Sequence, residues 1–283
     1  MKCLNLGCGY RYHSDWTNIN FVSTAENVIA HNLKDGIPFP DNSFDVVYHS
    51  HVLEHLSKSE AEPFLKECYR VIRPQGVLRV VVPDLEDIAR MYLHSLEQSS
   101  LGLQELEQNY QWMLLEMYDQ TVRTQPGGEM KKFLSRQDLH NQEFVIKRSG
   151  VEIKNIIMTA QKIKSSPSLA SENWIAKSVK YTYRLLKYRD YCYQAIIKLI
   201  LSATDLDALE IGRFRQAGEV HQWMYDRYSL SVLLKNCGLE GITKRTAYES
   251  YINDWTNFNL DTEPDSSVYK PDSLYMEAIK PTA

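Results

Sequence analysis

Cys3-Leu4-Asn5-Leu6-Gly7-Cys8-Gly9, near the start of the chain, is the stretch that indicates the fold. A short, mostly apolar run followed at once by glycine is typical of a buried strand that turns sharply. Glycines two positions apart let the backbone approach a ligand closely, because neither has a Cβ. The third glycine of the dinucleotide fingerprint is missing, so phosphate binding is not favoured. Taken alone, the stretch fits both a ligand site and a turn that needs glycine for its geometry only.

Short apolar runs punctuated by Gly, Pro and Asn fill the first third of the chain. The valine-rich run 77–82 is typical of a parallel strand that is buried on both faces. Residues 58–72 have helical spacing, and the Pro74 and Gly76 that follow them are usual stop signals. The same alternation returns near the C-terminus, where we expect a helix over residues 228–236 and strands over residues 242–249 and 273–279. These patterns predict an α/β domain built of βα repeats.

The middle of the chain has a different composition, with long helical periods and few glycines. The expected helices lie over residues 84–97, 103–118 and 176–201. We therefore predict a sheet domain from residues 1–88 and 216–283, interrupted by an α-helical insertion over residues 89–215. The insertion is expected to be a lid or substrate domain, with an oligomerisation element as the alternative. Residues 253–272 are polar and contain two prolines, which predicts a long surface loop.

The composition of the 283 residues argues against several functional classes. A net charge of −4 does not favour a nucleic-acid binder or a polybasic membrane anchor, and no apolar run approaches the roughly 20 residues that span a bilayer. The cysteines are scattered without CxxC spacing, so neither a zinc site nor a disulfide framework is indicated. The first residues lack the regions of a signal peptide. We expect a cytoplasmic protein that binds neither nucleic acid nor membrane, and a homodimer stays open.

Four further segments follow the glycine turn in a fixed order: residues 15–20, 38–47, 53–56 and 70–78. In order and spacing they closely resemble the methyltransferase type 11 group of class I S-adenosylmethionine-dependent methyltransferases. The resemblance covers residues 3–86. Residues 218–238 are more loosely similar to a segment of family members associated with glycan and natural-product gene clusters. The resemblance implies a Rossmann-like, doubly wound, mostly parallel seven-stranded sheet, with S-adenosyl-L-methionine as cofactor and S-adenosyl-L-homocysteine as product.

The resemblance also assigns the cofactor contacts. The loop from Gly7 to Gly9 would lie under the methionine moiety, so a Cβ at either glycine is expected to enter that space. Asn20 and Asn32 stand where the family usually has an acid on the ribose and an aspartate on the adenine amine, and losing both acids would weaken the cofactor's affinity. The full set of expected cofactor-binding residues is Asn5, Gly7, Cys8, Gly9, Asn20, Asn32, Leu33, Ser50 and His51.

Methyl transfer to oxygen or to a protonated amine also requires a proton acceptor. Side chains that follow the carboxyl ends of strands are the candidates, because ligands bind there in open α/β sheets. We rank them as His221, His51 and Asp84, with Tyr225 beside the first. Glu219 and Asp226 are expected to orient the His221 ring. For Asp84 a helix cap, and for the His221–Tyr225 pair simple packing, are the competing interpretations.

Two other patterns are weaker. His49, His51 and His55, with Asp84, have spacings that suit a metal, but the strand-to-helix junction would splay the first two, so we predict no metal site. Glu54 and His55 are expected to cap and pack the next helix. The basic aromatic segment 177–191 fits a solvated helix face, with a seat for an acidic substrate or a partner as the alternative.

The sequence thus predicts a methyltransferase that acts on an oxygen or nitrogen atom of a small molecule, either a natural product or a sugar. Two alternatives stay open. One is a catalytically silent binding protein with the same fold, suggested by Asn20 and Asn32. The other is an enzyme that uses S-adenosylmethionine for non-methyl chemistry. The acceptor itself is not identified by the sequence.

Overall fold

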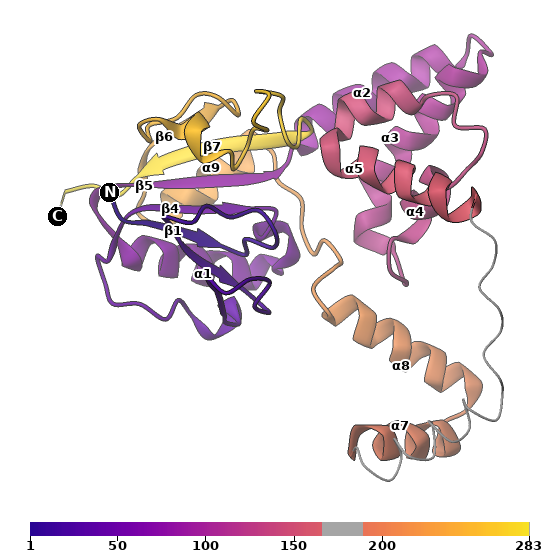
Figure 1. The fold of residues 1–283 in the computed structure, drawn as a ribbon, viewed down its shortest axis with the longest axis horizontal. Coiled ribbons are helices and arrows are strands. Elements are labelled where there is room, and N and C mark those ends of the chain that lie inside the picture. Colours follow the sequence, from indigo (N-terminus) through magenta and orange to yellow (C-terminus); the bar gives the residue numbers. More distant parts are fainter. Residues whose placement is uncertain (166–188, 283) are drawn as a thin grey trace.

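The computed structural model describes residues 1–165 and 189–282. Its sheet has seven strands in the order β3-β2-β1-β4-β5-β7-β6 (Figure 1). The strands are β1 (Cys3–Leu6), β2 (Thr17–Asn20), β3 (Val28–Ala30), β4 (Phe44–Ser50), β5 (Ile72–Pro83), β6 (Glu240–Arg245) and β7 (Ser273–Ile279). Strand β7 pairs antiparallel with both of its neighbours, and the remaining pairs are parallel. The predicted mostly parallel seven-stranded sheet is confirmed.

The strand order reverses beside β1, which lies between β2 and β4. In open α/β sheets, ligands bind beyond the carboxyl ends of the strands at such a switch point. Gly7 directly follows β1, and His51 directly follows β4. The topology therefore brings these two segments, distant in the sequence, to the same edge of the sheet.

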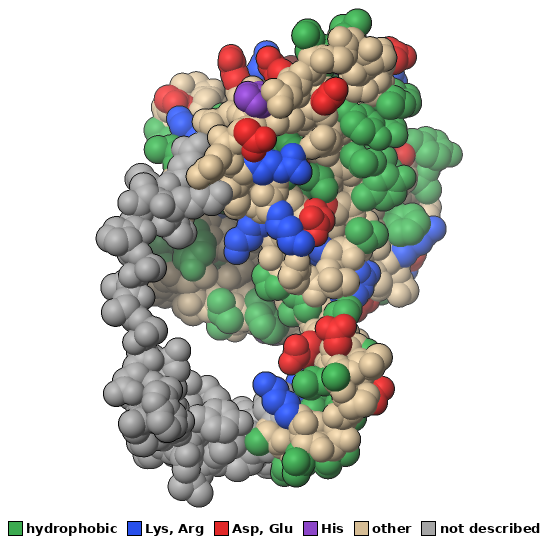
Figure 2. All heavy atoms as spheres, turned by 90° about the vertical axis from the view of Figure 1, so that its right-hand side faces the viewer, with side chains coloured by type: hydrophobic (Ala, Val, Ile, Leu, Met, Phe, Trp, Pro, Cys, Tyr) green, Lys and Arg blue, Asp and Glu red, His purple; other side chains and the backbone are tan. Residues whose placement is uncertain are grey.

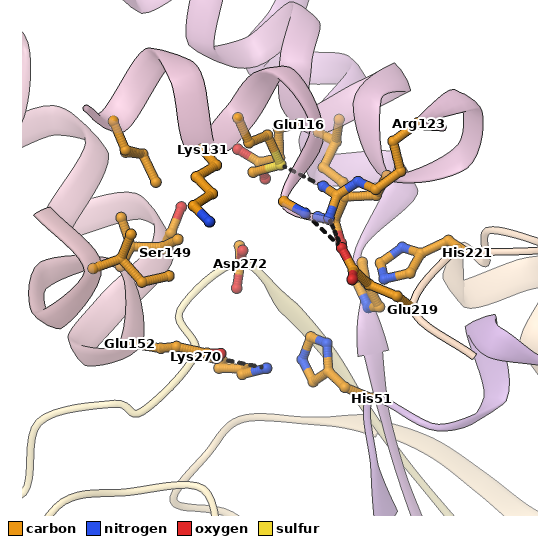
Figure 3. Close-up of a pocket in the computed structure, with 18 of the residues that line it drawn as sticks. His51, Glu116, Arg123, Lys131, Ser149, Glu152, Glu219, His221, Lys270 and Asp272 are labelled. Carbon is orange, nitrogen blue, oxygen red and sulfur yellow. Dashed lines mark hydrogen bonds and ion pairs between the residues drawn. The ribbon is translucent and has the colours of Figure 1, made fainter. Parts of the chain in front are cut away.

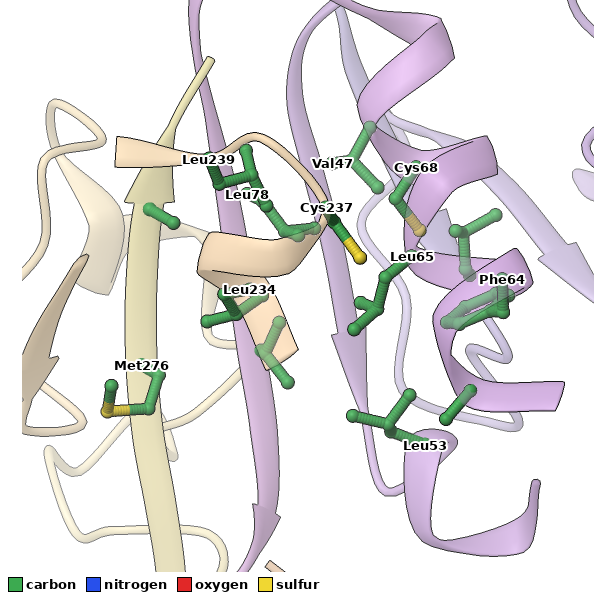
Figure 4. Close-up of a cluster of buried hydrophobic side chains, with 14 of the residues drawn as sticks. Val47, Leu53, Phe64, Leu65, Cys68, Leu78, Leu234, Cys237, Leu239 and Met276 are labelled. Carbon is green, nitrogen blue, oxygen red and sulfur yellow. The ribbon is translucent and has the colours of Figure 1, made fainter. Parts of the chain in front are cut away.

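One face of the sheet is covered by α1 (Lys58–Val71) and α9 (Arg227–Asn236). Helix α1 begins with a capping box between Ser57 and Glu60, and its apolar side packs Leu65 and Cys68 on the sheet (Figure 4). Both predicted helices are confirmed. The predicted strand over residues 242–249 instead runs from Glu240 to Arg245.

The opposite face carries a second apolar cluster around Trp16, Tyr48 and Trp255, where the short 3-10 helix η3 (Trp255–Phe258) lies. Arg79 points to this side, is fully buried, and pairs with Asp261 and with Glu277. The prediction of a surface loop over residues 253–272 is therefore wrong in part. A buried guanidinium needs carboxylate partners, and this segment supplies one of them from the interior.

A block of helices lies beyond the carboxyl ends of the parallel strands (Figure 1). It contains α2 (Leu85–Ser99), α3 (Gln104–Val122), α4 (Gly128–Leu134) and α5 (Gln142–Ser165). These helices share a core of their own around Trp112 and Phe133. Helix α5 is interrupted at Gly150, whose φ of 78° lies in the left-handed region. The predicted helices over residues 84–97 and 103–118 are confirmed.

Two further helices, α7 (Arg189–Ile200) and α8 (Ala203–Gln216), lead back toward the sheet. Arg215, at the end of α8, donates to the backbone carbonyls of Thr121 and Arg123. Residues 176–188 of the predicted third helix, and most of the basic aromatic segment, lie outside the described residues. The proposed division into a sheet domain and an insertion stays a prediction.

The outer face of the helical block carries Lys and Arg side chains interspersed with Asp and Glu (Figure 2). Neither sign of charge dominates that face. Within residues 1–165 and 189–282, none of the helices combines the length and the apolar composition needed to cross a bilayer.

Candidate functional site

The turn after β1 is a glycine loop with an unusual backbone. Gly7 and Gly9 have φ values of 66° and 54°, which L-residues rarely adopt. A Cβ at Gly9 would meet no atom within 4 Å, whereas a Cβ at Gly7 would run into the side chain of Val52. We expected a Cβ at either glycine to enter the space for the ligand. Only a Cβ at Gly9 would point into open space, because a Cβ at Gly7 would collide with the protein itself. Between the glycines, burial raises the pKa of the Cys8 thiol to about 11.

A cavity of about 370 Å³ lies against this loop, and we call it the glycine-loop cavity. Its lining includes Asn5, Gly7, Cys8, Gly9, Ser50 and His51, six of the nine residues expected to bind the cofactor, together with Tyr10, Arg11, Tyr48, Glu152, Leu260, Tyr269 and Lys270. The volume is in the range of small-molecule sites. The cavity and the open space at Gly9 lie where the resemblance predicts the methionine moiety, and that placement stays a prediction.

The remaining three expected contacts lie outside the lining of this cavity. Asn20 donates from Nδ2 to the carbonyl of Val22. Asn32 accepts from the amide of Lys34 and caps the 3-10 helix η1 (Leu33–Asp35). Their roles toward the ribose and the adenine stay predictions.

A second cavity, of about 510 Å³, opens between the sheet edge and the helical block, and we call it the helical cavity. Helices α3, α4 and α5 contribute Glu116, Lys131 and Ser149 to its wall (Figure 3). The two cavities share His51, Glu152 and Lys270. Lys270 Nζ lies 3.1 Å from Glu152 Oε2 at this junction.

Charged groups of both signs surround the helical cavity. Arg123 pairs with Asp119 and with Glu219. Burial raises the pKa of Glu116, and the pairing with Arg148 opposes this shift. The cavity therefore offers hydrogen-bonding and charged groups rather than a purely apolar surface.

Four titratable side chains gather where the helical cavity meets the 3-10 helix η2 (Leu53–His55). Glu54 is fully buried, and His51 Nδ1 lies 3.1 Å from its Oε1. Burial alone would raise the pKa of Glu54, but His51 and the other two imidazoles hold it below its ordinary value. The rings of His55 and His221 meet edge to face, 4.8 Å apart. Burial lowers the pKa of His221 to about 3, so its ring is neutral at pH 7.

Two of the four predicted proton acceptors reach the helical cavity, namely His221 and His51. The carboxylate of Asp84 caps α2 and pairs with Lys244 at 3.1 Å, the arrangement that the competing interpretation expects. Tyr225 is buried, its hydroxyl has no hydrogen-bond partner among the described residues, and burial raises its pKa to about 12. That any of the four removes a proton stays a prediction.

The expected orientation of His221 by Glu219 and Asp226 is wrong. Glu219 accepts from Arg123 and from the amide of Gly127. Asp226 caps α9. Both carboxylates are used by nearby backbone amides or by an arginine, and Glu54 is the carboxylate that faces the ring instead.

Glu54 and His55 also differ from their expected role. The cap of α1 is made by Ser57 and Glu60, so Glu54 is free to point into the histidine cluster. His49, by contrast, is fully buried against the ring of Phe64. The combination of His49, His51, His55 and Asp84 is therefore not assembled.

Three residues that line the helical cavity were not predicted from the sequence: Glu152, Lys270 and Asp272. Glu152 belongs to a helix without a motif, and the other two belong to the segment expected to be a surface loop. The only local signal was the polar composition of that segment, which predicts exposure as readily as a site.

Comparisons with known proteins match part of the chain to methyltransferases. The family model described as a methyltransferase domain matches residues 11–80. A protein of Mycolicibacterium smegmatis, described as a probable S-adenosylmethionine-dependent methyltransferase, is 46% identical over 48 residues, which is 17% of this chain and 18% of the relative. The chain thus matches about a fifth of the length of that relative.

Solved structures are similar at lower identity. An S-adenosylmethionine-dependent methyltransferase from Archaeoglobus fulgidus has a TM-score of 0.38 and 12% identity, over 99% of this chain and 86% of that one. A 1,6-didemethyltoxoflavin-N1-methyltransferase from Burkholderia thailandensis, with bound S-adenosylhomocysteine, has a TM-score of 0.24 and 18% identity, over 29% of this chain and 44% of that one.

The family-model match over residues 11–80 and the strand order together support a class I methyltransferase domain in this part of the chain. S-adenosylmethionine is the cofactor of this group. Both predictions are thereby confirmed at the level of the domain.

Proposed function

We propose that this protein transfers the methyl group of S-adenosylmethionine to an oxygen or nitrogen atom of a small molecule held in the helical cavity. The observation that carries the proposal is the junction of the two cavities at His51, Glu152 and Lys270. Methyl transfer needs the donor and the acceptor held in line at close range. A cofactor in one cavity and an acceptor in the other would meet at this junction.

S-adenosylmethionine supplies an activated methyl group, whose bond to sulfur breaks as the bond to the acceptor forms, leaving S-adenosylhomocysteine and a proton. The chain has three tasks. The glycine loop and Ser50 hold the methionine end, and α3 to α5 exclude water from the acceptor. His221 and His51, at the wall of the helical cavity, are the candidates to receive the proton.

The cavity also favours a class of acceptor. Its volume of about 510 Å³ suits a drug-sized molecule. Gln120, Ser149 and Asp272 add hydrogen-bonding groups to the charged ones. These features support a polar acceptor, such as a hydroxylated natural product or a sugar derivative.

The experiment is incubation of the purified chain with S-adenosylmethionine and pools of small hydroxylated or amine-bearing compounds, followed by mass spectrometry. The expected product carries one additional CH2 and appears with an equal amount of S-adenosylhomocysteine. Ser149→Phe should fill the helical cavity, because Ser149 is nearly buried in its wall. We expect this variant to lose turnover while it retains its affinity for the cofactor.

Two outcomes would contradict the proposal. Tight cofactor binding without any methylated product, over broad pools, would favour the silent binding protein. Equal turnover by Ser149→Phe and the parent would show that the acceptor binds elsewhere. Lys198→Phe, on the outlying helix α7, is the matched control and should leave turnover unchanged.

A further inference from the structure

Glu54, His55 and His221 come together at the wall of the helical cavity, where Glu54 and His221 are buried and His55 is partly buried. One donor atom from each lies within 4.8 Å of the others. The Glu54 side chain is fully buried. His51 Nδ1 lies 3.1 Å from its Oε1 without the geometry of a hydrogen bond, and within the described part of the chain neither oxygen has any other partner. Nδ1 of His55 also has no hydrogen-bond partner among residues 1–165 and 189–282. We propose that these three side chains bind a divalent transition-metal ion.

The lack of partners is what points to a ligand. A buried carboxylate or imidazole nitrogen without a hydrogen bond costs free energy of about 1–3 kcal/mol, and more when it is charged. Packing alone does not explain these side chains, because apolar side chains of similar size would fill the same space without the cost of an unpaired polar group. A cation bound between the three donors would satisfy all of them at once.

The donor set also indicates the kind of ion. Two imidazoles and one carboxylate suit Zn²⁺, Fe²⁺, Co²⁺ or Ni²⁺, whereas Mg²⁺ and Ca²⁺ prefer sites made of oxygen atoms. Three protein ligands leave the fourth position of a tetrahedral ion open, as in catalytic zinc sites.

The geometry needs only a small adjustment. Bonds of about 2.0–2.2 Å put neighbouring ligand atoms of a tetrahedral zinc ion roughly 3.4 Å apart. The donors, at most 4.8 Å apart, would have to close by up to about 1.4 Å. Rotation of the imidazoles and of the Glu54 carboxylate supplies a movement of this size, and His51 holds that carboxylate from its other side.

The open position would face the helical cavity, since both His55 and His221 line it. A metal ion lowers the pKa of an oxygen ligand, so a hydroxyl bound there would lose its proton more readily near neutral pH. This consequence selects oxygen acceptors, leaves His51 rather than the metal-bound His221 to receive the proton, and rests on the proposed function. The metal site itself does not depend on that function.

The test is a titration of the chelator-treated chain with Co²⁺, without S-adenosylmethionine, followed by visible absorption. We expect one ion per chain with the absorption of a histidine-bound Co²⁺, and a rise in the melting temperature. Glu54→Gln and His221→Asn should each weaken binding by about 100-fold or more. His94→Ala, which removes an exposed histidine of α2, is the control and should bind as the parent does.

Co²⁺ binding by the parent chain tests the proposal even if a variant fails to fold. Absence of Co²⁺ binding by the parent at millimolar concentration would overturn the proposal, as would equal affinity in the parent and both folded variants. Methyl transfer is measured separately, with and without chelator. A fall in turnover on chelation would support the role of the ion toward the acceptor, and unchanged turnover would refute that role. The Co²⁺ titration tests the metal site independently of turnover.

Discussion

Replacing Arg79 by methionine tests how the segment over residues 253–272 is held against the sheet. The guanidinium is fully buried, and it donates at 2.8 Å both to Asp261 and to Glu277. It also donates to the carbonyls of Thr246 and Glu249, at 2.8 and 3.0 Å. Methionine has a similar length but offers no charge and no donors. Buried Asp261 would therefore lose its cation, and buried Glu277 would keep only Arg245, at 3.3 Å.

The expected loss of stability follows from the burial of these carboxylates. Removing one partner of a buried ion pair destabilises a protein by about 3–5 kcal/mol, and here two carboxylates lose the same partner. Arg73→Met is the matched control, because Arg73 pairs with Asp45 at 2.7 Å with side chains that are 45% and 36% exposed. A surface pair of that kind contributes roughly 0–1 kcal/mol.

The assay is urea unfolding followed by near-ultraviolet circular dichroism. The Arg79 guanidinium lies 4.5 Å from the ring of Trp255, so this signal reports on the same region. Since Asp261 also accepts from the hydroxyl of Tyr48, which lines the glycine-loop cavity, the folded variant should bind S-adenosylmethionine more weakly. A loss of stability no larger than that of Arg73→Met would refute the reasoning.

Two further predictions concern the glycine loop and the start of α1. Gly9→Val should weaken S-adenosylmethionine binding, measured by calorimetry, about tenfold or more, because a β-branched residue at φ 54° costs roughly 1–2 kcal/mol and its side chain enters the open space. The control Gly212→Ala, on α8, should leave the affinity unchanged. Unchanged affinity in Gly9→Val would place the cofactor elsewhere. Lys34 and the capping contacts of Ser57 lower the pKa of Glu60 from 4.5 to about 2, so its contribution to stability is present above pH 4.5 and is lost as the pH falls through 2. Glu60→Gln should therefore melt about 2 °C lower than the parent at pH 7 and at the same temperature near pH 2, and a difference that persists in acid would contradict this assignment.

Much of the fold is visible in local sequence. The valines of β5 indicate a strand with two buried faces, and the glycine loop marks the end of β1. Helix α1 has both its cap and its stop signal in adjacent residues. Each of these features is determined by neighbours in the chain, so pattern and spacing are sufficient.

The site is less predictable, because it depends on contacts between distant segments. Glu152 and Lys270 meet at the junction of the cavities only after the helical block has packed against the sheet edge. Glu54 and His221 come together in the same way. The residues next to Glu54 in the sequence do not show whether it caps a helix or belongs to a site. Arg79 stands in a strand where alternation gives no sign of a buried charge.

The most direct test of the central claim is the transfer of an isotopically labelled methyl group from S-adenosylmethionine to a small-molecule acceptor. The junction of the two cavities at His51 predicts labelled product and S-adenosylhomocysteine in equal amounts, with both lost in Ser149→Phe and retained in Lys198→Phe. Label that stays on S-adenosylmethionine with every acceptor pool, while the parent binds the cofactor, would contradict the account.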